Sequence, residues 1–361
     1  MHKFLQSTVR WSFYSLFFLV PLVFYSKSHE LFEYNKMMLV YGLTIIIVGA
    51  WISKMILEKK IIFKRTFLDI PIILYLGSHV LSTLFSIDIH TSIWGYYSRF
   101  HEGLLATISY LCLYYALVSN LSKKDVFKIF AFSFASGIIV SLWGASEHFG
   151  VSPSCLVITG QANVDCWIQD VKSRVFATLG QPNWMAAYLD VLILSGIGFI
   201  AKFKLQNADS KDQKTETEFA IFSLQSAMTV LVPLFFAALL FTKSRSGLLG
   251  LFAGIGVIGL GSIITQGKKS LKLLKNKYLL ILFALLILLI SFFGLPFDKL
   301  DQLTFSNILI SKKQPITAVK PKTSDGYIDI GISESGDIRK IVWKGAINVW
   351  KRYPIFGSGV E

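Results

Sequence analysis

Four arginines lie in short polar segments that interrupt long apolar runs. They are Arg99 in "GYYSRFHEGL", Arg174 in "KSRVFATLGQPNWMAAYLD", Arg245 in "FTKSRSGLLG" and Arg339 in "GDIRKIVWKGAINVW". A guanidinium group stays charged and donates paired hydrogen bonds, so arginine is well suited to bind phosphate. Four arginines presented on one side of a membrane therefore predict an anion-binding site. For each arginine alone, the alternative is an interfacial anchor at a helix end.

A predicted helix start follows Arg174 by a few residues. Gln181, Pro182 and Asn183 come directly before an apolar run, and proline is favoured in the first turn of a helix. The N-terminus of that helix would present free N–H groups and the positive end of the helix dipole. We therefore place Asn183 with the arginines in a predicted diphosphate-binding site, although these residues could equally form an ordinary helix cap.

The composition of the chain indicates a membrane protein. Hydrophobic residues make up 53% of the 361 residues and charged residues only 16%, and several apolar runs reach the roughly 20 residues that a spanning helix needs. These runs lack the alternation that barrel strands show. We predict an all-α, polytopic membrane helical bundle. The net charge of +14 does not indicate nucleic-acid binding, because the cations lie in loops between the apolar runs.

The apolar runs predict about nine membrane spans and an orientation. Cations are concentrated in alternate loops, which hold 18 lysines and arginines, whereas the intervening short loops hold 7. The positive-inside rule places the richer loops and the N-terminus in the cytoplasm. The predicted spans are 11–25, 37–57, 67–85, 103–118, 126–146, 185–201, 219–241, 247–264 and 278–295.

This topology divides the chain into two parts. Residues 1–295 form the predicted transmembrane domain, and residues 296–361 form an extracytoplasmic segment. Within that segment, Arg339, Trp343, Ile347 and Trp350 recur at helical spacing, which predicts an amphipathic helix. Such a helix either packs on the protein or lies along the membrane surface, where membrane lipids would be its partner.

Two of the three cysteines lie in the predicted outer loop 147–184. Cys155 and Cys166 can form a disulfide in an extracytoplasmic compartment, or they can remain two free thiols. Cys112 lies within an apolar run and reads as a packing residue. No group of cysteines and histidines has the spacing of zinc ligands, so we expect no metal site.

Taken together, four motifs resemble those of the O-antigen ligase and O-antigen polymerase superfamily of membrane glycosyltransferases, the Wzy_C type. The motifs are "SRFHEGL", "RVFATLGQPNWMAAYL", "FTKSRSGLLGLFAG" and "IRKIVWKGAINVWKRYPIFGSGVE". Each is loose alone, but their order and their positions between spans make the combination specific. The resemblance implies a GT-C-like helical fold in the bacterial cytoplasmic (inner) membrane, and it implies no metal and no other cofactor.

The resemblance also implies a reaction and its partners. Members of this superfamily transfer a glycan from an undecaprenyl diphosphate carrier to an acceptor lipid, glycan or protein outside the cytoplasmic membrane. By motif, Arg174, Arg245 and Arg339 match the arginines that bind the diphosphate of the donor. We therefore expect an O-antigen ligase-like transferase. Polymerase and protein O-oligosaccharyltransferase functions stay open, as does a polysaccharide transporter or flippase.

The catalytic base is not identified by the motifs. The histidine of this superfamily follows the Gly-x-Gly turn matched by "FGSGVE", and the sequence stops at Glu361. The chain is therefore expected to be a fragment that lacks this histidine and the last spans. His101 and His148 are outer histidines outside that position, and Glu102 or Glu147 would serve as the base only by reaching the substrate pocket.

Overall fold

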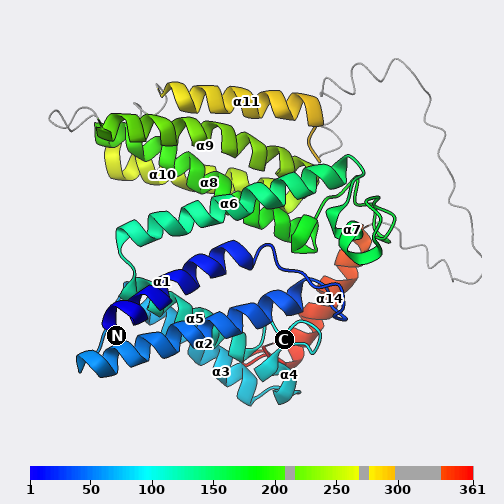
Figure 1. Ribbon diagram of the computed structural model, residues 1–361. Helices are drawn as coiled ribbons and strands as arrows, with labels where there is room; N and C mark the ends of the chain where they lie inside the picture. The colour runs from blue at the N-terminus through cyan, green and yellow to red at the C-terminus, as the bar shows by residue number, and fades with distance from the viewer. Residues whose placement is uncertain (208–215, 268–275, 297–334, 361) are drawn as a thin grey trace, which may run out of the picture. The chain divides into compact units, whose positions relative to one another are not determined.

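The computed structural model of the protein describes residues 1–207, 216–267, 276–296 and 335–360 (Figure 1). All regular secondary structure in these residues is helical, which confirms the all-α prediction. The longer helices are α1 (His2–Leu19), α2 (Glu33–Glu58), α3 (Asp69–Leu84), α5 (Leu104–Asn120), α6 (Lys123–His148), α8 (Pro182–Asn207), α9 (Glu216–Phe241), α10 (Arg245–Gln266), α11 (Lys277–Phe293) and α14 (Ser335–Arg352). The shorter ones are α4 (Ile89–Trp94), α7 (Pro153–Thr159) and the 3₁₀ helix η1 (Ala177–Leu179).

Several of these helices have the length and composition of membrane spans. Four are long and apolar enough to cross a bilayer: α2, α6, the first 20 residues of α8, and α10 up to Thr265. Four shorter apolar helices cover Asp69–Leu84, Leu104–Asn120, Gln225–Phe241 and Lys277–Phe293. The chain is therefore a multi-pass helical membrane protein, and these eight helices coincide with eight of the nine predicted spans.

The first predicted span, 11–25, has wrong boundaries. Helix α1 begins at His2 and ends at Leu19. It ends early because Pro21 disfavours helical geometry at the residue before it. The predicted start is too late because the first turns of α1 carry polar residues such as Gln6 and Arg10, which a search for apolar runs does not include.

The chain folds into two compact units, each described here on its own. The first unit contains residues 1–13, 37–122 and the described part of 314–361, and the second contains residues 14–36 and the described part of 123–313. In the first unit, α3, α4 and α5 pack together. The predicted boundary at residue 295 stays a prediction, and residues 297–334 of the predicted extracytoplasmic segment lie outside the described residues.

Helix α9 occupies the centre of the second unit. It packs against α6, α8 and α11, and α8 also packs against α10 (Figure 1). The core between these helices is apolar and fully buried. The exposed fraction is 0% for Met185, Leu189, Ile193 and Phe235. Burial of these side chains fixes the helices against each other, and the loops at their ends are thereby brought to defined positions.

Helices α8 and α10 approach each other closely through small residues. A Cβ atom added to Gly247 would lie only 2.5 Å from the Cβ atom of Ala186. One turn further along α10, a Cβ atom on Gly250 would lie 3.2 Å from Oδ2 of Asp190. Small residues at such contacts are typical of membrane helix packing, because they let the backbones come together. The seam also places the N-termini of α8 and α10 side by side.

Candidate active site

A side-chain hydrogen bond joins the N-termini of α8 and α10. Ser244 is the N-cap of α10, and its Oγ accepts a hydrogen bond from the backbone N–H of Gly247 at 3.1 Å. The same hydroxyl donates to Oδ1 of Asn183, in the first turn of α8, at 2.8 Å. Each helix N-terminus has unsatisfied N–H groups and a partial positive charge. Two such ends at one place form a favourable environment for an anion.

Arg174 is tied to the same end of the second unit through its neighbour in the chain. The backbone N–H of Val175 donates to the carbonyl oxygen of Phe241, the last residue of α9, at 3.2 Å. This bond holds Arg174 beside the short turn that leads from α9 into Ser244 and α10. Arg174 is exposed, and its guanidinium makes no hydrogen bond or ion pair with any described residue.

Two more cations lie in that turn. Lys243 and Arg245 are both exposed and flank the buried Ser244. Lys243 adopts a positive φ of 47°, which is uncommon for a residue with a side chain and is found at functional turns. Nε of Arg245 donates to the carbonyl oxygen of Pro296 at 2.6 Å. This bond orients the Arg245 side chain at the start of α10.

His148 ends α6 next to these cations. Its ring stacks on Phe241, with centroids 4.1 Å apart and planes 10° from parallel. Nδ1 of the ring lies 2.8 Å from the carbonyl oxygen of Lys172. Since a carbonyl only accepts, Nδ1 carries the hydrogen, and Nε2 of the neutral ring is left with its lone pair. His148 is therefore an oriented histidine whose Nε2 can accept a proton.

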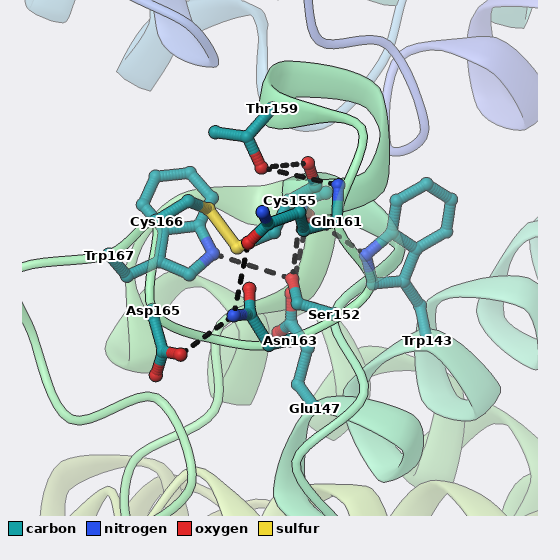
Figure 2. Close-up of a disulfide and its surroundings, with 11 residues drawn as sticks. Trp143, Glu147, Ser152, Cys155, Thr159, Gln161, Asn163, Asp165, Cys166 and Trp167 are labelled. Carbon is teal, nitrogen blue, oxygen red and sulfur yellow. Dashed lines mark hydrogen bonds between the residues drawn. A yellow bond between two sulfur atoms is a disulfide. The ribbon is translucent and has the colours of Figure 1, made fainter.

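The loop between α6 and α8, which carries Arg174, is cross-linked. Cys155 and Cys166 form a disulfide with their Cα atoms 5.6 Å apart (Figure 2). Ser152 caps the short helix α7 by accepting a hydrogen bond from the N–H of Cys155 at 3.3 Å. The indole N–H of Trp167 donates to the same hydroxyl at 3.4 Å. These links make a compact loop between α6 and the Arg174 segment.

Glu147 is the anchor of this loop and is not a candidate base. Its side chain is fully buried. Its Oε1 accepts hydrogen bonds from the hydroxyls of Ser152 at 3.1 Å and Ser154 at 3.2 Å, and its Oε2 accepts from the backbone N–H of Ala177 at 3.0 Å. Glu147 would act as a base only by reaching the substrate pocket, and its carboxylate has no exposed surface and already accepts three hydrogen bonds.

The remaining predicted site residues belong to the first unit. Arg99 is exposed in the loop between α4 and α5, where the hydroxyl of Tyr41 donates to the carbonyl oxygen of Phe100 at 2.8 Å. In the same loop His101 faces Glu102, with Nε2 and Oε1 3.7 Å apart. Arg339 is exposed on α14, whose described side chains from residue 339 to 352 are all exposed.

The Gly-x-Gly turn after α14 docks on the loop that leads into α4. The N–H of Ile87 donates to the carbonyl oxygen of Ser358 at 3.0 Å, and the N–H of Val360 donates to Oγ of Ser92 at 3.3 Å. Gly359 has a φ of 145°, and a Cβ atom there would lie 2.5 Å from the Oγ of Ser92. Only glycine fits this position, because its lack of a side chain lets the turn come into close contact with Ser92.

The structure thus brings Arg174, Asn183 and Arg245 to one end of the second unit, and it places Arg99 and Arg339 in the first unit. Sequence reasoning missed Ser244, because a serine beside an arginine carries no signal of a partner 61 residues away. Among the described residues, no three His, Cys, Asp or Glu side chains are arranged to hold a metal ion.

Comparison with known proteins gives one match. The model of the O-antigen ligase family, Wzy_C, matches residues 230–361, which include the α9–α10 turn with Arg245 and the Gly-x-Gly turn. No curated protein and no solved structure matches the chain. The matched region contains two of the four motifs, those with Arg245 and Arg339, and it excludes those with Arg99 and Arg174. Over these residues the chain is similar to the O-antigen ligase family, whose members are glycosyltransferase- or ligase-type enzymes.

Proposed function

We propose that the protein transfers a glycan from an undecaprenyl diphosphate carrier to an acceptor at the outer face of the bacterial cytoplasmic membrane. The observation that carries the proposal is the hydrogen bond between Asn183 and Ser244, which joins two helix N-termini beside Arg174 and Arg245. A diphosphate is the group on the donor that such a cluster of positive charge would bind.

The chemistry of transfer needs positive charge at this position. The acceptor hydroxyl attacks the anomeric carbon of the first sugar, and the bond between that carbon and the diphosphate oxygen breaks. The electron pair of that bond leaves with the diphosphate, which gains negative charge in the transition state. Arg174 and Arg245, held in place before the reaction, would stabilise that charge. The proton of the hydroxyl passes to a base.

His148 is the candidate for that base among the described residues. Its hydrogen bond to the carbonyl of Lys172 keeps Nε2 as the proton-accepting nitrogen, and its stacking on Phe241 places the ring beside the Arg174 segment. The family resemblance points instead to a histidine after Glu361. Replacing His148 by Gln in the full-length protein separates the two assignments, because transfer should persist if the later histidine is the base.

Arg99 and Arg339 remain proposed ligands of the donor diphosphate on motif grounds. Arg339 matches the family pattern, whereas Arg99 rests on its position in an outer loop. Replacing either arginine by Ala should lower the affinity for the donor. The loss should appear as a higher KM if the arginine binds the ground state and the transition state equally.

The central experiment replaces Arg174 or Arg245 in the full-length protein by Ala and by Lys. Transfer from a purified undecaprenyl diphosphate-linked glycan should be abolished by either Ala variant, while membrane insertion is kept. The Lys variants should also fail if paired hydrogen bonds matter, because lysine offers a point charge only. Arg10→Ala, in α1, is the matched control. Full transfer by either Ala variant would remove the site assignment.

A ligase, a polymerase and a protein O-oligosaccharyltransferase share this donor chemistry and differ in acceptor. Supplying lipid A core, a second carrier-linked glycan or a peptide as the acceptor distinguishes them by product.

A transporter or flippase is the second candidate. It is favoured by Asp190, a buried carboxylate of α8 whose Oδ1 has no hydrogen-bond partner among the described residues, since buried charges in spans mark transport paths. Movement of a labelled lipid-linked glycan across vesicles without transfer, lost in Asp190→Asn, would favour transport.

A further inference from the structure

An apolar cavity opens between α2, α3 and α5 of the first unit. Its volume is about 280 Å³, and its lining is almost wholly apolar and aromatic, with Trp51, Phe63, Leu76, Cys112 and Tyr115 among the lining residues. Trp51 and Phe63 stack at 6.4 Å between centroids, and Phe63 stacks on Tyr115 at 4.8 Å. Cavities of this kind in membrane proteins suit hydrocarbon chains.

A second, basic cavity lies next to the first. Its volume is about 340 Å³, and its lining includes Lys54, Lys60 and Lys64 together with one acidic residue, Glu58. Glu58 is already paired with His2. The cavity is therefore positively charged, which suits an anionic group.

Lys54 is held in the wall of this basic cavity. Only 8% of the residue is exposed, and Nζ donates to Oε1 of Gln6 at 2.7 Å and to Oδ1 of Asn120 at 3.4 Å. An ammonium group has three N–H donors, so two are used and one is left. The partners are neutral amides, and within the described part of the chain no ion pair cancels the charge of Lys54.

Phe63 joins the two cavities. It lines both of them, and the backbone around it is fixed by hydrogen bonds from the indole of Trp51 to the carbonyl of Ile62 at 2.9 Å and from the N–H of Lys64 to Oγ of Ser119 at 3.0 Å. A basic cavity beside an apolar one is complementary to a lipid with an anionic headgroup and a hydrocarbon tail.

We propose that this pair of cavities is a binding site for an anionic phospholipid, with its phosphate among Lys54, Lys60 and Lys64 and an acyl chain in the cavity lined by Trp51 and Tyr115. Charge complementarity selects this occupant, because a zwitterionic lipid would meet the same lysines with no net negative charge. The loop 59–65 is predicted to face the cytoplasm, where the positive-inside rule collects such lysines. The site lies wholly in the first unit, and it does not depend on the proposed transfer reaction.

The test measures lipid retention by the purified full-length protein with native mass spectrometry. Phosphatidylglycerol and phosphatidylcholine of the same acyl chains are added after delipidation, and phosphatidylglycerol should be retained preferentially. The variant Lys60→Ala/Lys64→Ala should lose about 25-fold in phosphatidylglycerol affinity, since each cation near a lipid surface is worth roughly a factor of five. The matched control, Lys123→Ala/Lys124→Ala, removes the same charge at exposed positions of α6 and should change nothing.

A second variant tests the apolar cavity. Ile73 lines it and is 64% exposed, so Ile73→Trp fills the opening without disturbing a buried core and should also weaken retention. The proposal is overturned if the two lipids bind equally, or if the lysine variant and its control behave alike. It is also overturned if inorganic phosphate displaces phosphatidylglycerol at matched concentration, because the site would then hold a free anion.

Discussion

Two arginine-bearing regions of the molecule differ in how the rest of the chain holds them. In the second unit, Arg174 and Arg245 flank a turn fixed by hydrogen bonds from Val175 to Phe241 and from Ser244 to Asn183. In the first unit, Arg339 stands on α14, a helix whose described side chains are exposed over its whole circumference.

The difference teaches that similar motifs can have different structural support. Arg174 and Arg245 lie beside a turn that hydrogen bonds hold in place, so in the proposed reaction little reorganisation would be needed to stabilise a developing anion. Arg339 lies on a helix that also exposes Trp343 and Trp350. An amphipathic helix of this composition gains its order from whatever covers its apolar face. Substitutions in the two regions should therefore differ in how strongly they affect glycan transfer.

The largest effect is expected from the disulfide of the loop between α6 and α8. Replacing Cys155 and Cys166 by Ser should lower the free energy of unfolding by about 3 kcal/mol, because a cross-link over a short loop restricts the unfolded chain. Thermal unfolding in detergent measures this. Reductant should destabilise the wild type alone, and Cys112→Ser, which leaves the disulfide intact, serves as the control. Equal melting of the wild type and the double variant would contradict a structural role for this cross-link.

The next effect separates the two regions most directly. Gly247→Val should force α10 away from Ala186 and reduce transfer by about 100-fold, because displacing a site by an ångström can cost that much. Gly345→Val, on α14, meets no atom within 4 Å and should leave transfer nearly unchanged. Initial rates of glycan transfer by the full-length protein measure both. If Gly345→Val is the more damaging variant, the comparison between the regions is wrong.

A smaller effect concerns the bond between the two helix N-termini. Ser244→Ala should cost about 1 kcal/mol for the lost cap of α10. In a double-mutant cycle, Ser244→Ala and Asn183→Ala should be coupled by about 1 kcal/mol, because they share a hydrogen bond. Asn276→Ala, which removes the cap of α11, should be additive with Asn183→Ala. Additivity in both pairs would show that the Asn183–Ser244 bond contributes nothing.

The smallest effect is a pH dependence in the loop between α6 and α8. Hydrogen bonds from the side chain and the backbone N–H of Ser173 lower the pKa of the Asp170 carboxyl. A lowered pKa in the folded state means that Asp170 stabilises the fold above its unfolded pKa and loses this contribution as the pH falls through the folded value. Asp170→Asn should therefore melt slightly below the wild type at pH 6, and the two should converge as the pH is lowered below 4. A difference that grows on acidification would have the wrong sign.

The helical membrane character could be predicted because it depends on local properties. Apolar runs of sufficient length mark helices wherever they pack, and the predicted ranges for α2 and α9 begin three or four residues late and end within one residue of the observed helices. The prediction failed at α1, where polar residues begin the helix and Pro21 ends it. It also missed α4 and α7, which are short and lie in loops without a long apolar run.

The chemistry of the site could be predicted only as a list of residue types. The sequence by itself determined that the chain is a helical membrane protein and that cationic turns interrupt its spans, because hydropathy and charge are properties of consecutive residues. Only the tertiary structure decided that Ser244 forms a hydrogen bond with Asn183 and that Arg174 lies beside the start of α10. It also decided that Glu147 is buried and accepts hydrogen bonds within the loop. These contacts join residues far apart in the chain, and they form because the packing of α8, α9 and α10 brings the helix ends together.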